Sequence, residues 1–220
     1  KISDINIELD KFNEAIKWAK KANKVSRSSG EAISQIGKVY YKGFQSCRSE
    51  IISLDDRIVA SLAFEAFDKA EKDARDQNNR LLNNNGSRSV ESFHRDLGHI
   101  MWENCGMARN QGGLTKAISE IQSLKKDYWE KVRVPGRDNV MNPELEKAGR
   151  VADFLELGEL MVRDALDRSE SCGGHFREES QTAEGEALRD DENFTFSSAW
   201  EYKGDATEPI RNKEKLTFDT

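Results

Sequence analysis

The sequence predicts a mainly α-helical fold, a three- to four-helix up-down bundle of the spectrin-repeat type with a small C-terminal β-hairpin. Three observations lead to this prediction. Apolar residues recur every three or four positions over long stretches. Clusters of Asn, Gly and Pro separate those stretches, as expected for turns. Aromatic residues alternate with other side chains only near the C-terminus, which is typical of a strand.

The first part of the chain carries two helical patterns and no recognisable motif. One amphipathic helix is expected from four apolar residues at helical spacing, which are Leu9, Phe12, Ile16 and Ala19. A Ser- and Gly-rich stretch at 26–30 ends it. A second, weaker helix is expected around Ile33, Ile36 and Tyr40, because Gly37 and Gly43 lower its helical propensity.

The bundle begins with two longer patterns. A helix of about 55–82 is expected, followed by an Asn-Gly turn at 83–86. Ser89 then opens a second helix, whose apolar stripe contains Phe93 and Leu97.

Two further helices complete the bundle. The third has apolar residues at three-and-four spacing from Leu114 to Tyr128. The fourth, about 143–170, begins at Asn142-Pro143, where Asn caps the helix and Pro occupies its first turn. It is apolar around much of its circumference, so we expect it to be the central, most buried helix.

A strand and a short partner are predicted after this helix. One set of alternate positions reads Phe194, Phe196, Ser198, Trp200 and Tyr202. Period two with aromatic residues indicates a strand, and Lys215–Phe218 is the expected partner.

Charge is unevenly distributed along the chain. Residues 1–64 have a net charge of +3 and residues 65–220 a net charge of −9. This shift favours a boundary near residue 64. We therefore expect an unassigned helical segment (1–64), a helical bundle domain (65–170), and a charged loop with a short β-rich tail (171–220).

Composition narrows the class of protein. The net charge of −6 argues against nucleic acid as a partner. Three cysteines outside any CxxC pair, Cys47, Cys105 and Cys172, favour a reducing compartment over a disulfide framework. No apolar run approaches the ~18 residues of a membrane span, and no dinucleotide or P-loop glycine motif is present. The first residue is Lys1 rather than Met, which favours a fragment of a longer chain.

Two residue pairs have metal-ligand spacing but lack the rest of a site. Glu91 and His94 resemble half of a di-iron pair, which needs a second Glu-x-x-His and two further Glu. Cys172 and His175 resemble half of a zinc site or a Cys/His nucleophilic pair. We expect a solvated helix face at the first pair. At the second we expect a small buried cysteine beside Gly173-Gly174, which ends the helix in the αL conformation.

Opposite charges lie on both sides of the loop that follows the fourth helix. Guanidinium groups match carboxylates bidentately, so the arginines are expected to hold this loop to itself or to a partner surface. The predicted loop-pinning or docking residues are His175, Arg177, Glu178, Arg189, Asp190 and Asp191. No catalytic, cofactor-binding or metal-binding residue is predicted.

Five segments, in order, carry a resemblance to a known family. They are Met101-Trp-Glu-Asn, Ala152-Asp-Phe-Leu-Glu-Leu-Gly-Glu-Leu, Ala165-Leu-Asp-Arg-Ser-Glu-Ser, His175-Phe-Arg-Glu and Arg189-Asp-Asp-Glu-Asn. Together they resemble the C-terminal helical domain and tail of the succinate dehydrogenase/fumarate reductase flavoprotein subunit over residues 65–220, and residues 1–64 have no counterpart. The chain departs from the family where Cys172 and Gly174 replace Arg and Ala, and in an acidic insert at 180–188.

The resemblance implies an oxidoreductase of electron transport and the tricarboxylic acid cycle that interconverts succinate and fumarate. It implies that the covalently bound FAD and the substrate-binding residues lie upstream, so no cofactor is expected in this chain. The implied partners are the FAD-binding domain of the same subunit and an iron–sulfur subunit, without nucleic acid and without direct membrane insertion. The implied location is cytoplasmic, peripheral on the inner membrane face within a complex.

Two other functions remain open from the sequence. One is a free-standing helical protein-interaction module. The other is a metal- or thiol-based redox protein.

Overall fold

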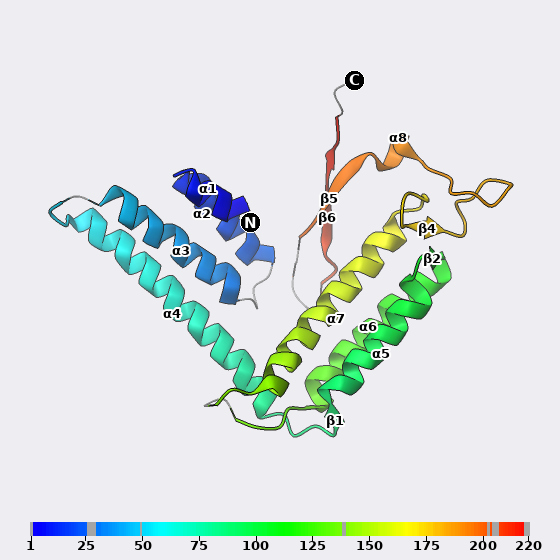
Figure 1. The fold of residues 1–220 in the computed structure, drawn as a ribbon, viewed down its shortest axis with the longest axis horizontal. Coiled ribbons are helices and arrows are strands. Elements are labelled where there is room, and N and C mark those ends of the chain that lie inside the picture. Colours follow the sequence, from blue (N-terminus) through cyan, green and yellow to red (C-terminus); the bar gives the residue numbers. More distant parts are fainter. Residues whose placement is uncertain are drawn as a thin grey trace. The chain divides into compact units, whose positions relative to one another are not determined.

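The computed structural model describes residues 2–25, 30–48, 50–137, 140–201, 203 and 207–217. The chain is mainly helical with a small antiparallel strand pair near its C-terminus, which confirms the predicted fold class (Figure 1). By spatial contact it divides into two compact units, residues 1–77 with 196–220, and residues 78–195. The boundaries expected near residues 64 and 170 do not coincide with the limits of these units. The division into domains 1–64, 65–170 and 171–220 stays a prediction.

The first unit contains helices from the N-terminal part and the C-terminal strands. Its elements are α1 (Ile2–Glu8), α2 (Phe12–Val25), α3 (Gly30–Cys47), most of α4 (Leu54–Leu82), β5 (Phe196–Glu201) and β6 (Ile210–Lys215). The opening amphipathic helix predicted from Leu9, Phe12, Ile16 and Ala19 is confirmed as α2, except that Leu9 lies before its start. The chain turns at Asp10, which has φ 55°, and Leu9 is exposed. The hydroxyl of buried Ser3 donates to the carbonyl of Ala15 at 2.9 Å and thereby ties α1 to α2.

Close packing within this unit depends on Gly37 of α3. A Cβ at this position would lie 2.9 Å from ring carbons of Phe67 on α4. The glycine that lowers helical propensity therefore makes room for an aromatic ring of the neighbouring helix. The long helix predicted at about 55–82 is confirmed as α4.

The hairpin pairs β5 with β6 antiparallel, with Phe196 opposite Lys215. The predicted second strand at 215–218 is wrong, because the paired segment is Ile210–Lys215. That segment lacks aromatic alternation, but it places Lys213 Nζ 4.3 Å from the ring centroid of Phe196. Phe194 belongs to a short helix, and Tyr202 and Phe218 lie outside the described residues.

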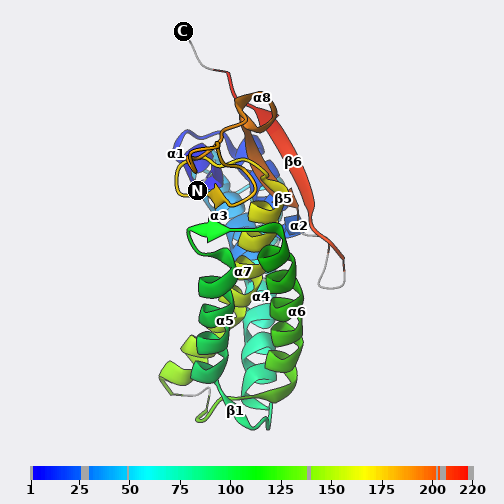
Figure 2. The ribbon, with the colours of Figure 1, turned by 90° about the vertical axis from the view of Figure 1, so that its right-hand side faces the viewer.

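The second unit is a three-helix bundle that runs up, down and up (Figure 2). Its helices are α5 (Val90–Cys105), α6 (Gln111–Lys131) and α7 (Pro143–Asp167), with the short α8 (Asp191–Phe194) beyond them. Two short parallel pairs tie the two ends of the bundle. They are β1 (Arg88–Ser89) with β3 (Val132–Arg133), and β2 (Ala108–Arg109) with β4 (Phe176–Arg177).

Each bundle helix starts at a capping side chain. Ser89 Oγ, Asn110 Oδ1 and Asn142 Oδ1 each accept from the backbone N–H three residues later. Such caps satisfy N–H groups that have no partner within the helix. The helix starts predicted at Ser89 and at Asn142-Pro143 are therefore confirmed.

Tyr128 of α6 holds the centre of the bundle. Its side chain is fully buried, and its hydroxyl donates to the carbonyl of Ala148 on α7 at 2.6 Å. Its ring meets Phe93 of α5 edge-on, with centroids 5.1 Å apart. One residue therefore contacts all three helices, with its polar atom satisfied.

α7 carries more buried residues than α5 or α6, as predicted for the most buried helix of the bundle, but its burial is confined to one face. Val151, Leu155 and Val162 lie in the core, but neighbouring apolar residues on the opposite side are exposed. The reason is that two partner helices cover only one stripe of α7. The helix also ends at Asp167, three residues before the predicted end. Among the described residues no helix is long and apolar enough to cross a bilayer.

Candidate functional site

The loop after α7 begins with a tight turn at Cys172–His175. The backbone groups of these two residues exchange hydrogen bonds of 2.8 and 3.1 Å. Gly173, with φ +59°, provides the left-handed conformation that closes the turn. The sequence predicted that the glycine pair ends the helix. Instead, α7 ends at Asp167 and the pair shapes a turn in the loop. Cys172 is partly exposed rather than buried.

Arg177 closes the C-terminal end of α7. It is 4% exposed, and its Nη1 donates to the carbonyl oxygens of Ala165 and Leu166 at 3.1 Å. The last carbonyls of a helix have no partner within it and carry the negative end of its dipole, so a cation is stabilised there. The sequence predicted carboxylate partners, but only Glu179 fills that role, at 3.1 Å from Nε.

Ser171 fixes the backbone on which Arg177 lies. This serine is fully buried, and its Oγ accepts from the N–H of Arg177 at 2.8 Å. The same hydroxyl donates to the carbonyl of Arg177 at 3.2 Å. Main chain and side chain of Arg177 are therefore both held from within the second unit.

His175 lies between two arginines. Its Nδ1 is 2.9 Å from Nη1 of Arg109, and its Nε2 is 2.8 Å from the carbonyl of Arg168. Arginine only donates, so Nδ1 accepts, and Nε2 carries the proton that is donated to the carbonyl. Burial lowers the pKa of His175, and nearby guanidinium groups lower it further, against the opposing effect of the backbone bond.

Glu170 is a buried carboxylate that the sequence analysis missed. It is 2% exposed and accepts from Arg168 at 2.9 and 2.6 Å. It also accepts from the backbone N–H of Asp190 at 2.7 Å, which ties the far end of the loop to its beginning. The sequence signal for this ion pair was Arg168-Ser-Glu170 directly after α7, because a buried carboxylate requires a partner such as a nearby arginine.

Two glutamates of the loop hold the start of α6. Glu178 accepts from the side chain of Asn110 at 2.8 Å, and Glu179 accepts from the backbone N–H of Gln111 at 2.6 Å. The pKa of Glu179 is lowered, first because of that backbone N–H bond. Carboxylates are favoured at a helix N-terminus, so the loop joins the end of α7 to the start of α6.

Arg189 and its neighbours lie at the surface. Arg189 pairs with Asp191 at 2.6 Å, and both side chains are more than 60% exposed. Asp190 caps α8 by accepting from the N–H of Asn193 at 3.2 Å. Of the six predicted loop residues, His175, Arg177 and Glu178 therefore contact the bundle ends. The half-buried Asp190 bonds to Glu170 through its backbone N–H, whereas Arg189 and Asp191 pair with each other at the surface.

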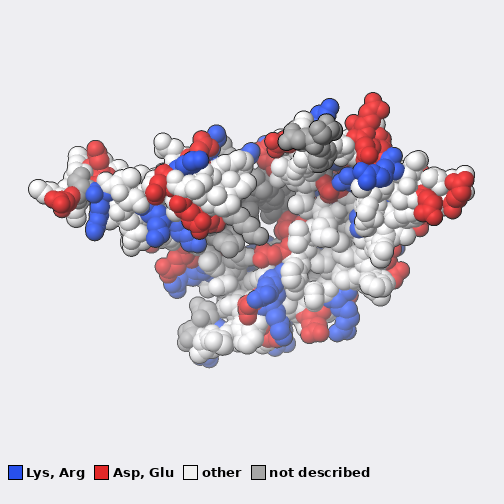
Figure 3. Space-filling model, turned by 45° about the horizontal axis from the view of Figure 1, so that its top comes forward, with Lys and Arg blue, Asp and Glu red and all other residues white. Residues whose placement is uncertain are grey.

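The acidic insert forms a small hairpin of its own. Thr182 N–H donates to the carbonyl of Glu186 at 2.8 Å, and Gly185 takes φ +85° at its tip. Red Asp and Glu atoms gather at the right-hand tip of the face drawn in Figure 3, where this loop lies. Its exposed side chains face solvent.

The pair Glu91 and His94 lies on α5. Glu91 and His94 are exposed, and the His94 ring stacks on Phe154 with centroids 5.8 Å apart. Within the described ranges, no group of three or more His, Cys, Asp or Glu side chains is placed to hold a metal ion. Cys105 is buried, and its burial raises the pKa of the thiol.

An exposed apolar stripe runs along the bundle. On α7 it consists of Phe154, Leu157 and Met161, which are 42%, 52% and 50% exposed. Their three-and-four spacing places them on one face of the helix. On α5 the side chain of Trp102 is 80% exposed. Large apolar side chains gathered in this way mark an interaction surface more often than single exposed ones do.

Comparison of the sequence with known proteins identifies a family. The family described as "Fumarate reductase flavoprotein C-term" matches residues 94–220. The fumarate reductase flavoprotein subunits of Proteus vulgaris and Haemophilus influenzae are 30% and 29% identical to this chain, over 59% and 51% of its length. The chain spans only 21% and 18% of those proteins.

Solved structures show the same fold. An E. coli quinol–fumarate reductase variant superposes with a TM-score of 0.61 at 22% identity, over 75% of this chain and 28% of that one. A Mycobacterium smegmatis Sdh1 complex gives 0.55 at 21% identity, over 75% and 30%. Since the family match covers more than half of the sequence, the chain belongs to the fumarate reductase flavoprotein C-terminal family, as its motifs predicted.

Proposed function

We propose that this chain is the C-terminal structural and docking region of a flavoprotein that interconverts succinate and fumarate. In this proposal the FAD and substrate sites belong to a preceding region, and the helical bundle packs against it. The parent enzyme is then an FAD-dependent oxidoreductase, and this chain supplies no group that touches the flavin.

The observation that carries the proposal is the apolar stripe on α7. Phe154, Leu157 and Met161 are each about half exposed on a helix whose other face is in the core. Removing apolar surface from water stabilises by roughly 25 cal/mol per Å². A flavoprotein domain that covers this stripe would gain that stabilisation, and Trp102 on α5 offers a further anchor.

The charged loop supports a structural role rather than a catalytic one. The buried groups Arg177 and Glu170 are each hydrogen-bonded to partners within the second unit. The imidazole of His175 likewise has both nitrogens bonded. We infer that these residues pin the loop, and that Arg189, Asp190 and Asp191 form its outer, docking side.

Partner and location follow from the same proposal. The structural neighbours are quinol–fumarate reductase and Sdh1 complexes. By analogy, the parent flavoprotein passes electrons to an iron–sulfur subunit and lies peripherally on the inner membrane face.

The cofactor part of the proposal is tested by flavin binding. The purified 220-residue chain should show no flavin absorbance in the visible range, and titration with FAD, succinate or fumarate should give no binding heat. Circular dichroism on the same sample establishes that the helices are folded. Stoichiometric flavin, or saturable binding of either dicarboxylate, would overturn the proposal. So would a coding region upstream of Lys1 that encodes no FAD-binding domain.

A further inference from the structure

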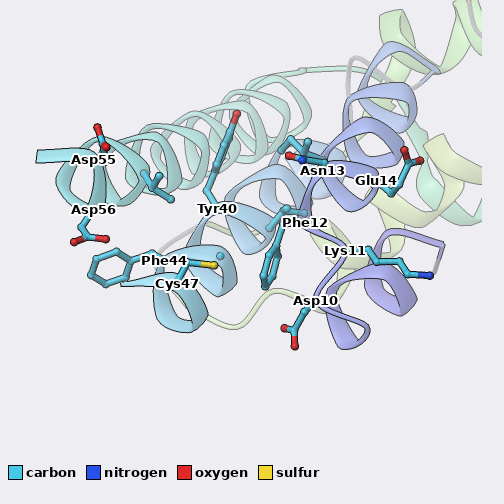
Figure 4. Close-up of a pocket in the computed structure, with 14 residues that line it drawn as sticks. Asp10, Lys11, Phe12, Asn13, Glu14, Tyr40, Phe44, Cys47, Asp55 and Asp56 are labelled. Carbon is cyan, nitrogen blue, oxygen red and sulfur yellow. The ribbon is translucent and has the colours of Figure 1, made fainter. Parts of the chain in front are cut away.

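A groove of about 710 Å³ lies in the first unit between α2, α3 and the start of α4. It is built entirely from residues that precede the segment matched by the family. Its floor is aromatic and aliphatic, with Phe12 from α2 and Tyr40 and Phe44 from α3 (Figure 4). These three side chains are half-buried, so each still presents apolar surface to an incoming group.

Acidic residues lie at both ends of this floor. Figure 4 shows Asp55 and Asp56 at one end, and Glu14 beyond Phe12 toward the other. With Asp10, four carboxylates line the groove against one ammonium group, that of Lys11. Two further cations lie close by: the guanidinium of Arg48 is 6.0 Å from the Phe44 ring, and Lys17 Nζ is 3.6 Å from Glu14, so the four carboxylates face three cations. The side chains of the Lys17–Glu14 pair are 72% and 52% exposed, so this pair is weak and Glu14 can exchange it for a cation of a partner.

The end of the groove near α4 is held in a defined geometry. Asp56 accepts from both the N–H and the hydroxyl of Ser53 at 2.8 Å. Ser53 Oγ in turn accepts from the N–H of Asp56 at 3.2 Å. This reciprocal cap fixes the first turn of α4, on which Asp55 lies.

We propose that this groove docks a basic amphipathic segment of a partner protein. An apolar side chain of the partner lies over Phe12 and Phe44, and Lys or Arg residues on either side pair with Asp55 and Glu14. Carboxylates separated by an apolar floor match a segment in which cations flank an apolar anchor. A single small cation would not reach both ends of the floor or cover it. The proposal does not depend on the flavoprotein role of the second unit.

The test uses a labelled model peptide of about 18 residues, long enough to form a helix, with Leu on one face and Lys on the other. Its binding to the full 220-residue chain is followed by fluorescence anisotropy, with a Glu-for-Lys peptide as the reference. The Glu14→Gln/Asp55→Asn double variant should raise the Kd of the Lys peptide about 3- to 10-fold, the range expected for two exposed ion pairs. The matched control Glu65→Gln/Asp68→Asn removes the same charge from α4 outside the groove and should leave the Kd unchanged.

Several results would overturn the proposal. They are equal weakening by both double variants, equal affinity for the Lys and Glu peptides, and no saturable binding of the Lys peptide. Dodecylamine, which carries one cation and one apolar chain, should not displace the peptide at comparable concentration. Displacement by that amine would instead assign the groove to a small amphiphilic cation.

Discussion

Nη1 of Arg109 donates to Nδ1 of His175 at 2.9 Å, across 66 positions of sequence. Arg109 lies on β2 and His175 directly precedes β4, and these strands pair in parallel. The opposite ring nitrogen of His175 donates to the carbonyl of Arg168. A second proton on the ring would remove the acceptor that Arg109 uses and add a cation beside arginines. The loop is therefore joined to the bundle by a histidine that must stay neutral.

Stability should fall as pH is lowered because of His175. The pKa of His175 is lowered in the folded chain, so the unfolded chain takes up the proton first. Its contribution is fully present above the unfolded value of about 6.5 and is lost as pH falls below it. Urea unfolding at several pH values should show a steeper fall for the unaltered chain than for His175→Gln. That variant leaves the other two histidines in place, and parallel curves would remove His175 from the account.

Arg177 and Arg189 should differ sharply in their effect on stability. Arg177→Ala removes the donor to the last carbonyls of α7 and should lower the free energy of unfolding by about 1–3 kcal/mol. Arg189→Ala breaks an exposed pair and should change it by less than about 0.5 kcal/mol. Denaturant unfolding measures both. Equal losses in the two variants would contradict the pinning role of Arg177.

The adjacent glycines of the loop provide a matched pair. Gly173→Ala places a Cβ at φ +59° and should lower the free energy of unfolding by about 1 kcal/mol. Gly174 lacks a positive φ and has open space around its Cα, so Gly174→Ala should stay within about 0.5 kcal/mol. Chemical denaturation of both variants distinguishes a required turn from a flexible linker. A reversed order would contradict the turn.

Helices and their starting residues were predictable from the sequence because their causes are local. Ser89 and Asn142 cap helices through bonds to residues three positions away. The apolar spacing from Leu114 to Tyr128 likewise reflects one face of one helix. The break at Asp10 was missed because an exposed Leu9 fits an apolar pattern without being part of a core.

The candidate loop was predictable only in part, because its partners are distant or are backbone atoms. The charges of Arg177 and Glu178 were visible in the sequence, and so was the glycine pair. The carbonyl partners of Arg177 and the bond from Arg109 depend on the pairing of β2 with β4, which two-residue strands do not reveal by periodicity. The stripe on α7 was seen as apolar, but its exposure depends on how many helices surround it.

Docking of the bundle onto its flavoprotein region is the central claim, and one binding measurement tests it most directly. The proposal places an FAD-binding region upstream of Lys1. That region is supplied as a separate chain, and its Kd for the 220-residue chain is measured. Leu157→Glu, on the exposed stripe, should raise the Kd about 30-fold, as for a contact worth ~2 kcal/mol. Ser123→Glu adds the same charge at an exposed position of α6 and should leave the Kd unchanged. Equal affinity of the Leu157→Glu and unaltered chains would contradict the account.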